Sequence, residues 1–211
     1  MLEAENISYR FTDNQPWIVQ NAKLRIAPGE FVGLYGHSGE GKTTFAKILA
    51  GYLLPARGTV RVDQAQLPRK GYCPVQMVFQ HPETALNPRW CIRDSLGEAG
   101  AALDERLHHF HLRKEWLERK PHELSGGELQ RIAIARILVS GTRYLLADEI
   151  TTMLDAITQV QIWKALLDFA KKENIGVLVI SHDAQLMEKV CDRVVNIAGI
   201  QQKGGAAKKM V

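Results

Sequence analysis

The sequence has few cysteines and no long apolar run. Its 3 cysteines, Cys73, Cys91 and Cys191, are odd in number, and their spacings fit no zinc or redox motif, so we expect reduced thiols. No apolar run approaches the ~20 residues that a membrane helix needs. Glu3 and Glu5 interrupt any apolar start of the kind that a secretory signal requires. We therefore expect neither a membrane-spanning protein nor a disulfide-stapled secreted one.

The sequence also lacks a strong charge of either sign. Lys and Arg total 27 and Asp and Glu total 23, which gives a net charge of +4. This small excess favours a solvated surface over a face that binds nucleic acid or an acidic membrane. The 211 residues, 45% of them apolar and 24% charged, are typical of a globular domain. Such a chain is long enough to bury a full hydrophobic core.

Short apolar segments alternate with helical patterns along the chain. Strands are predicted at residues 2–11, 17–26, 30–36, 59–67, 74–80, 143–149, 176–183 and 193–199, and helices at 43–54, 157–174 and 184–191. This alternation predicts an α/β fold with a mostly parallel sheet. Residues 87–137 are rich in leucine, charge and histidine, and we expect a helical insertion there, between residues 1–86 and 138–211 of a single domain. Three of the 4 tryptophans are expected to pack in cores or at seams: Trp90, Trp116 and Trp163.

The segment GHSGEGKTT matches the pattern G-x-x-x-x-G-K-[ST] of a phosphate-binding loop. It follows a predicted strand and opens a predicted helix, which is the context that the pattern requires. Glycines let the backbone N–H groups approach phosphate, and the helix N-terminus attracts the same anion. We expect Lys42 to bind the β- and γ-phosphates and Thr43 to ligate Mg²⁺. The predicted ATP-binding residues of the loop are Gly36, His37, Ser38, Gly39, Glu40, Gly41, Lys42, Thr43 and Thr44. The loop alone leaves a kinase, a GTPase and a motor ATPase open.

Two predicted strands end in ionisable residues. Asp148 and Glu149 end one strand, and His182 lies at the end of another. In a parallel sheet these ends meet at the edge where ligands bind, and successive side chains point to opposite faces. Asp148 is therefore predicted to hold a metal beside Thr43, Glu149 to act as the general base, and His182 to contact the γ-phosphate. A charged strand end in solvent and a histidine bonded to backbone are the structural alternatives.

The segment LSGGELQR, Leu124–Arg131, resembles the signature sequence of ATP-binding cassette (ABC) proteins. GHSGEGKTT resembles the family's Walker A loop and LLADE its Walker B strand, in the family's order. The resemblance implies a P-loop ABC-ATPase fold with an N-terminal antiparallel β subdomain and an inserted helical subdomain. It also implies that Gln80 is the Q-loop glutamine, a catalytic residue that also ligates Mg²⁺. Asp155 would belong to the D-loop and His182 to the H-loop. The ring of Phe11 would stack on adenine, and Tyr9 is a weaker candidate for the same contact.

The signature has a physical basis of its own. Ser125, Gly126, Gly127 and Glu128 begin a predicted helix, where small residues expose backbone N–H groups as a second anion site. In ABC proteins the signature of one subunit completes the ATP site of another. The resemblance therefore implies a head-to-tail dimer, either of two identical subunits or with a paralogue. A plain helix N-cap at Ser125 is the structural alternative.

Residues 81–89, HPETALNPR, resemble the ATPases of importers for peptides, nickel and metal-chelating opines. This implies hydrolysis of ATP with Mg²⁺ to power import. The partners implied are integral-membrane permease subunits at the cytoplasmic face of the cell membrane and, indirectly, a solute-binding protein, with no nucleic acid. A soluble ABC-type ATPase that acts on nucleic acid or ribosomes is the alternative. The sequence departs from the family at Ile150, where proline is usual, and at Met153, where alanine is usual.

The sequence LHHFHL contains three histidines close together. Their spacing places only His108 and His111 on one helical face. We therefore favour a solvated helix over a metal site at this position.

Overall fold

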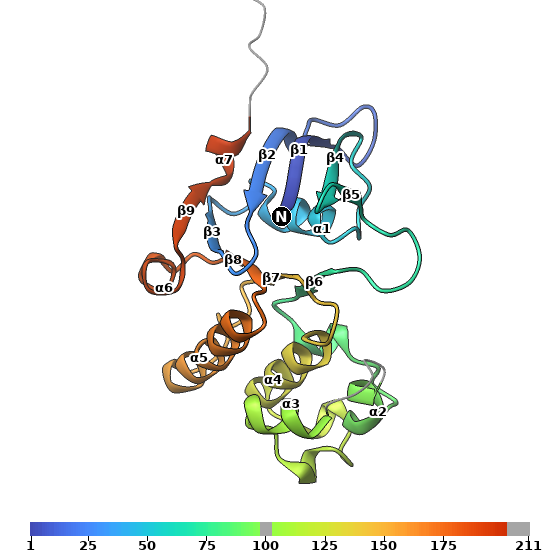
Figure 1. Ribbon diagram of the computed structural model, residues 1–211, viewed down its shortest axis with the longest axis vertical. Coiled ribbons are helices and arrows are strands. Elements are labelled where there is room, and N and C mark those ends of the chain that lie inside the picture. The colour runs from blue at the N-terminus through green and yellow to red at the C-terminus, as the bar shows by residue number, and fades with distance from the viewer. Residues whose placement is uncertain (98–102, 202–211) are drawn as a thin grey trace, which may run out of the picture.

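The strands form two separate sheets (Figure 1). The computed structural model describes residues 1–97 and 103–201, so residues 98–102 of the predicted insertion and 202–211 of the predicted core lie outside it. The strands are β1 (Leu2–Tyr9), β2 (Val19–Ile26), β3 (Phe31–Tyr35), β4 (Arg57–Val62), β5 (Ala65–Gln66), β6 (Val75–Val78), β7 (Tyr144–Asp148), β8 (Gly176–Ile180) and β9 (Arg193–Asn196). An antiparallel sheet has the order β2-β1-β4-β5, and a parallel sheet has the order β6-β7-β8-β3-β9.

Helices cover the parallel sheet and extend beyond it. They are α1 (Lys42–Leu49), α2 (Ile92–Gly97), α3 (Leu103–His109), α4 (Gly126–Ile137), α5 (Ala156–Lys172), α6 (Ala184–Val190) and α7 (Ile197–Ile200), with 3₁₀ turns η1 (Pro82–Ala85), η2 (Lys114–Trp116) and η3 (Pro121–Glu123). Helices α2, α3 and α4 gather at the end of the molecule farthest from the antiparallel sheet (Figure 1). None of the helices in the described residues has the length and apolar character needed to cross a membrane.

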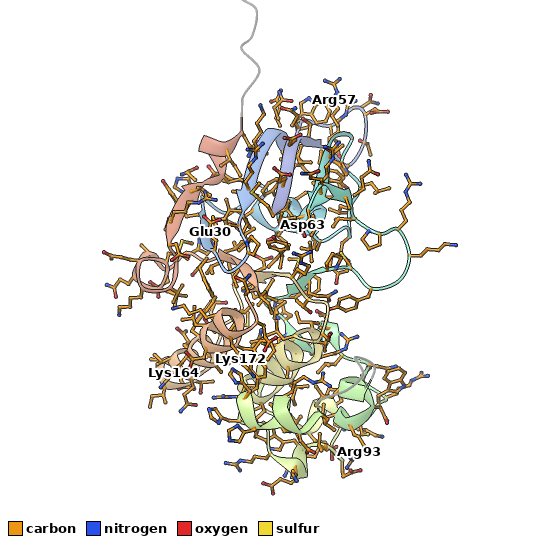
Figure 2. All side chains as sticks on the ribbon, in the orientation of Figure 1. Glu30, Arg57, Asp63, Arg93, Lys164 and Lys172 are labelled. Atoms are coloured by element: carbon orange, nitrogen blue, oxygen red, sulfur yellow. The ribbon has the colours of Figure 1, made fainter. Side chains whose placement is uncertain are left out.

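The parallel sheet is buried on both faces, which explains the continuous apolar runs of its central strands. Every residue of β7 and β8 is buried. Leu145 packs in one core with Leu166 of α5, whereas Leu146 packs in a second core with Phe45 of α1 and Ile7 of the antiparallel sheet. Alternate side chains of one strand therefore join two cores. Charged side chains such as Arg57 and Lys164 project from the outside of the molecule (Figure 2).

The fold class predicted from the sequence is confirmed, whereas several element boundaries differ from the predicted ones. Residues 59–67 form a hairpin instead of one strand, because Asp63 and Gln64 turn with φ of 49° and 69°. The helix predicted at 43–54 ends at Leu49, two residues before Gly51, whose φ is 78°. The last strand ends at Asn196, whose Oδ1 accepts a 2.7 Å hydrogen bond from the N–H of Ala198 and so caps α7.

The exposure of the tryptophans and the bonding of the cysteines test two further expectations. Trp116 and Trp163 are 6% and 4% exposed, as expected of core residues, whereas Trp90 is 39% exposed and so does not pack in a core. All three cysteines are free, as predicted.

The two-sided core makes a stability prediction. Leu146 is fully buried at the centre of the parallel sheet, so Leu146→Ala should lower the free energy of unfolding by about 2–5 kcal/mol. Leu54→Ala is the control, because Leu54 is 81% exposed, and it should change that free energy by less than ~0.5 kcal/mol. Urea denaturation measures both, and equal effects would contradict the assignment of Leu146 to the core.

Candidate functional site

A cavity lies where the parallel strands end. Strands β6, β7, β8 and β3 are neighbours in the sheet, and their carboxyl ends share one edge. A cavity of ≈ 450 Å³ opens there, lined by Phe11, Ile18, Ser38, Gly39, Gly41, Lys42, Thr43, Thr44, Gln80, Asp148, Glu149 and His182. All but Ile18 were predicted as site residues from the sequence. Gly36, His37 and Glu40, which were also predicted, are not among the lining residues.

The loop between β3 and α1 is shaped for an anion. Lys42 is 6% exposed, and its Nζ donates hydrogen bonds to the carbonyl oxygens of Gly36, at 2.7 Å, and His37, at 2.9 Å. Gly41 has a φ of 91°, and a Cβ there would lie 2.8 Å from the carbonyl oxygen of Ile18. Only glycine fits that position. No side chain caps α1 in the described part of the chain, so its first N–H groups and the lysine face the same anion site.

Thr43 and Asp148 form the floor of the cavity. The Thr43 hydroxyl hydrogen-bonds to the Asp148 carboxylate, which is only 6% exposed. Burial raises the pKa of Asp148, and the charge of Glu149 raises it further, while the Thr43 hydrogen bond and Lys47 and Lys42 lower it. A buried carboxylate and a neighbouring hydroxyl thus provide oxygen donors, the kind that hard divalent cations prefer.

Glu149 is held by the backbone and by His182. Its N–H donates a 2.9 Å hydrogen bond to the carbonyl of Ile180, and its φ of 52° turns the chain directly after Asp148. A positive φ is uncommon for a residue other than glycine. The Oε1 of Glu149 lies 2.6 Å from Nε2 of His182. The turn therefore directs adjacent carboxylates to different partners, Thr43 for Asp148 and His182 for Glu149.

A threonine that was not singled out from the sequence links the Q-loop to this turn. Gln80 Nε2 donates to Thr152 Oγ1 at 3.3 Å, and Thr152 Oγ1 donates to the carbonyl oxygen of Glu149 at 3.0 Å. The only sequence signal was a hydroxyl three residues after the acidic pair. Ile18 was missed because its contact with the loop joins segments distant in sequence.

The signature residues form a capped helix start away from the cavity. Ser125 Oγ accepts a 3.4 Å hydrogen bond from the N–H of Glu128, and the Glu128 carboxylate accepts a 2.8 Å bond from the N–H of Ser125. This reciprocal pair is a capping box. The cap that the sequence left as an alternative is thus present. Gly126 and Gly127 follow it as the first residues of α4, and none of these four residues lines the cavity.

Asp155 also caps a helix. Its Oδ1 accepts hydrogen bonds from the N–H groups of Ile157, at 3.1 Å, and Thr158, at 3.0 Å. A side-chain hydrogen bond from Thr158, together with these backbone bonds, lowers the pKa of Asp155. In this subunit the aspartate of the predicted D-loop therefore holds the start of α5.

Phe11 is the aromatic side chain of the cavity. Its ring is 65% exposed and meets the ring of Tyr9 edge-on at 5.5 Å. Phe11 lines the cavity and Tyr9 does not. An exposed ring face at the rim can stack on a base.

The three histidines of LHHFHL do not point toward a common metal-binding position. His109 Nε2 lies 2.9 Å from the carbonyl oxygen of Ala165, and its ring packs edge-on against Phe110 and Phe169. His108 and His111 are exposed. Within residues 1–97 and 103–201 no three metal-ligating side chains gather into a site.

Similar proteins share both the sequence and the fold. The family model described as ABC transporter matches residues 19–152. A nickel import system ATP-binding protein NikE of Staphylococcus aureus is 32% identical over 92% of this chain and 85% of its own. The energy-coupling factor transporter ATP-binding protein EcfA1 of Oceanobacillus iheyensis is 28% identical over 92% of this chain and 74% of its own.

Solved structures of an ATP-binding cassette have the same fold as this chain. The ATP-binding cassette MJ0796, in a dimeric post-hydrolysis state with ADP and Pi, is 25% identical, has a TM-score of 0.80 and covers 97% of each chain. A second dimeric structure of MJ0796 is 26% identical with a TM-score of 0.78, over 93% of this chain and 94% of that one. The chain therefore belongs to the ABC transporter family, as a subunit that binds and hydrolyses ATP.

Proposed function

We propose that this ATPase powers an importer for peptides, nickel or metal-chelate and opine-type solutes. The NikE relatives and the HPETALNPR segment support this group. The observation that carries the catalytic part of the proposal is one cavity that joins Lys42, Asp148, Glu149 and His182. We further propose residues 1–86 and 138–211 as the core with its β subdomain, and residues 87–137 as the helical signature subdomain.

ATP binds with its triphosphate on the loop from Gly36 to Thr44 and its base on Phe11. The Lys42 ammonium and the α1 N-terminus stabilise the phosphates. Thr43, Asp148 and Gln80 would supply the oxygen donors for Mg²⁺, and the donor set fits that hard cation because it includes the buried carboxylate of Asp148. When bound, Mg²⁺ neutralises charge that develops on the transferring phosphoryl group.

Glu149 is the general base for the attacking water. Its carboxylate, 2.6 Å from His182 Nε2, accepts the water proton while the imidazole fixes its orientation and contacts the γ-phosphate. The positive φ of Glu149 turns that carboxylate away from the metal-binding Asp148. Positioning and charge stabilisation then supply most of the rate enhancement.

A second cassette completes the site. Ser125, Gly126, Gly127 and Glu128 do not line the cavity of their own subunit, yet they present the N-terminus of the twelve-residue helix α4. In a head-to-tail dimer, with an identical subunit or a paralogue, they close over the γ-phosphate, and Asp155 lies at the same contact. The dimeric state of the MJ0796 cassette supports this arrangement.

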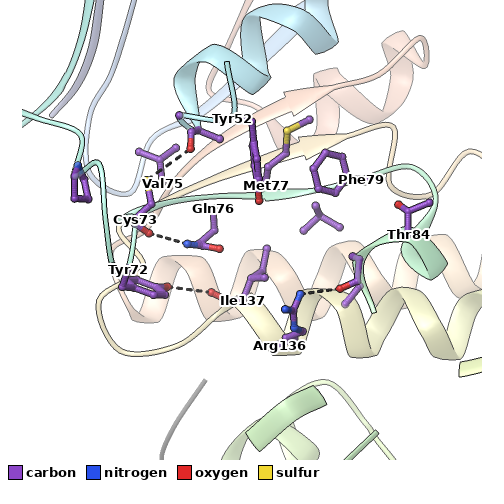
Figure 3. Close-up of a pocket in the computed structure, with 17 residues that line it drawn as sticks. Tyr52, Tyr72, Cys73, Val75, Gln76, Met77, Phe79, Thr84, Arg136 and Ile137 are labelled. Carbon is purple, nitrogen blue, oxygen red and sulfur yellow. Dashed lines mark hydrogen bonds between the residues drawn. The ribbon is translucent and has the colours of Figure 1, made fainter. Parts of the chain in front are cut away.

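A second cavity is the proposed contact with the permease. It has ≈ 620 Å³ and lies between the end of β6 and α4, with Tyr52, Met77 and Phe79 on one side and Arg136 and Ile137 on the other (Figure 3). Gln80, which lines the ATP cavity, directly follows Phe79 in the chain. A cytoplasmic segment of a membrane subunit seated here would sense nucleotide through Gln80. The protein then works at the cytoplasmic face of the membrane, with a solute-binding protein acting indirectly and no nucleic acid.

Glu149→Gln tests the catalytic assignment. The amide cannot take a proton, so the variant should bind ATP and dimerise but lose turnover by about 10²–10⁴-fold. Phosphate release and light scattering with ATP and Mg²⁺ measure the two effects. Lys42→Ala is the control, because it should lose ATP binding and remain monomeric with ATP. Turnover of Glu149→Gln near the wild-type rate would contradict the assignment of Glu149 as the general base.

His182→Ala separates water positioning from binding. Removing the imidazole that holds Glu149 should lower kcat by roughly 10²-fold or more. The Kd for ATP should change less than about threefold, because an exposed charged contact is expected to contribute only ~0.6 kcal/mol to the free energy of binding. Single-turnover hydrolysis and fluorescent-nucleotide titration measure the two quantities. An unchanged kcat would show that His182 is only a surface histidine.

Tyr52→Asp tests the permease contact. Tyr52 is 57% exposed and packs against Phe79 with ring centroids 5.6 Å apart, so a charge there should weaken docking and leave ATP binding intact. Co-purification with co-expressed permease subunits of this importer group measures it. Leu54→Asp is a matched control, since Leu54 is 81% exposed but does not line this cavity. Equal loss in both variants would argue against this cavity as the docking site.

A further inference from the structure

The phosphate-binding loop contains a carboxylate that does not face the nucleotide. Glu40 stands between two glycines of the loop, where a negative charge would repel phosphate. Its side chain turns back toward the start of the loop: Oε2 accepts a 2.8 Å hydrogen bond from the N–H of His37. A Cβ placed on Gly36 would lie 2.5 Å from the same oxygen. Glu40 is therefore packed against the first bend of the loop and does not line the ATP cavity.

His37 is held through both of its backbone groups. Its N–H donates to Glu40 Oε2, and its carbonyl oxygen accepts from Lys42 Nζ, at 2.9 Å, and from the N–H of Glu40, at 3.3 Å. These hydrogen bonds within the loop tie its first bend to its second half. A loop that is already ordered pays less conformational entropy when the ligand arrives.

We propose that Glu40 is a positioning residue that preorganises the phosphate-binding loop through the N–H of His37. The hydrogen bond favours ATP binding, whereas the charge of the same carboxylate opposes it. Glu40 therefore acts on affinity for ATP and leaves the hydrolysis step alone. The inference rests on ATP binding at this loop, but not on the proposed solute or on the roles of Glu149 and His182.

Three substitutions separate the hydrogen bond from the charge. Glu40→Ala removes both, and we expect the Kd and KM for ATP to rise roughly fivefold to tenfold, since the loss of a hydrogen bond to a charged group outweighs the relieved repulsion. Glu40→Gln keeps an oxygen acceptor without the charge and should restore the wild-type Kd or lower it. Glu40→Asp keeps the charge but is too short to reach His37, so it should weaken binding at least as much as alanine does.

The measurements are fluorescent-nucleotide titration and steady-state hydrolysis with Mg·ATP. In all three variants kcat should stay within about twofold of the wild type, because a residue that only orders the binding loop does not act in the chemical step. Glu188→Ala, which removes an exposed carboxylate on α6, is the control and should change neither constant. Thermal melting without nucleotide identifies any variant that fails to fold. In that case the two remaining Glu40 variants test the proposal.

Two outcomes overturn the proposal. If Glu40→Ala and Glu40→Asp bind ATP as the wild type does, the hydrogen bond to His37 has no role in binding. If Glu40→Gln is as weak as Glu40→Ala, the charge matters and the acceptor does not. Failure of the wild-type protein itself to bind ATP would instead refute the assignment of the nucleotide site.

Discussion

The site depends on the register of the parallel sheet. Leu34 on β3 and Asp148 on β7 both pair with Ile180 on β8, so the carboxyl ends of three strands lie side by side. Because the chain leaves each strand at that edge, the phosphate loop, the acidic pair and His182 reach one cavity. A slip of one residue would turn every side chain of a strand to the other face and place apolar side chains where the carboxylates now stand. Burial on both faces of β7 and β8 prevents such a slip.

The backbone turn after Asp148 gives the carboxylates of Asp148 and Glu149 different surroundings. Asp148 ends β7 in a buried position against Thr43, where its oxygen atoms suit a metal. Glu149 has left-handed backbone geometry and meets His182. The carbonyl of Glu149 is in turn bonded to Thr152, which Gln80 contacts. Two hydrogen bonds through Thr152 therefore link the side chain of Gln80 to the backbone of Glu149.

The sequence predicted the features that local pattern determines. The glycine-rich loop between a strand and a helix, the ionisable residues at strand ends and the helical character of 87–137 all follow from residue type and spacing. It did not predict what tertiary contacts determine. The positive φ of Glu149, the bond from Gln80 to Thr152 and the contact of Ile18 with the loop each join distant segments. Trp90 was expected in a core or at a seam, but it is 39% exposed. Glu40 was predicted to bind ATP from its place in the motif alone, whereas its side chain binds the loop.

We propose that the two adjacent carboxylates have separate roles, with Asp148 holding Mg²⁺ and Glu149 activating water. The most direct measurement is the affinity of the Asp148→Asn variant for ATP, by calorimetry with Mg²⁺ and with a chelator. The wild type should bind ATP more tightly with Mg²⁺, and the variant should bind with one affinity in both conditions. If Asp148→Asn keeps the wild-type dependence on Mg²⁺, the metal is held elsewhere and the division of roles is wrong.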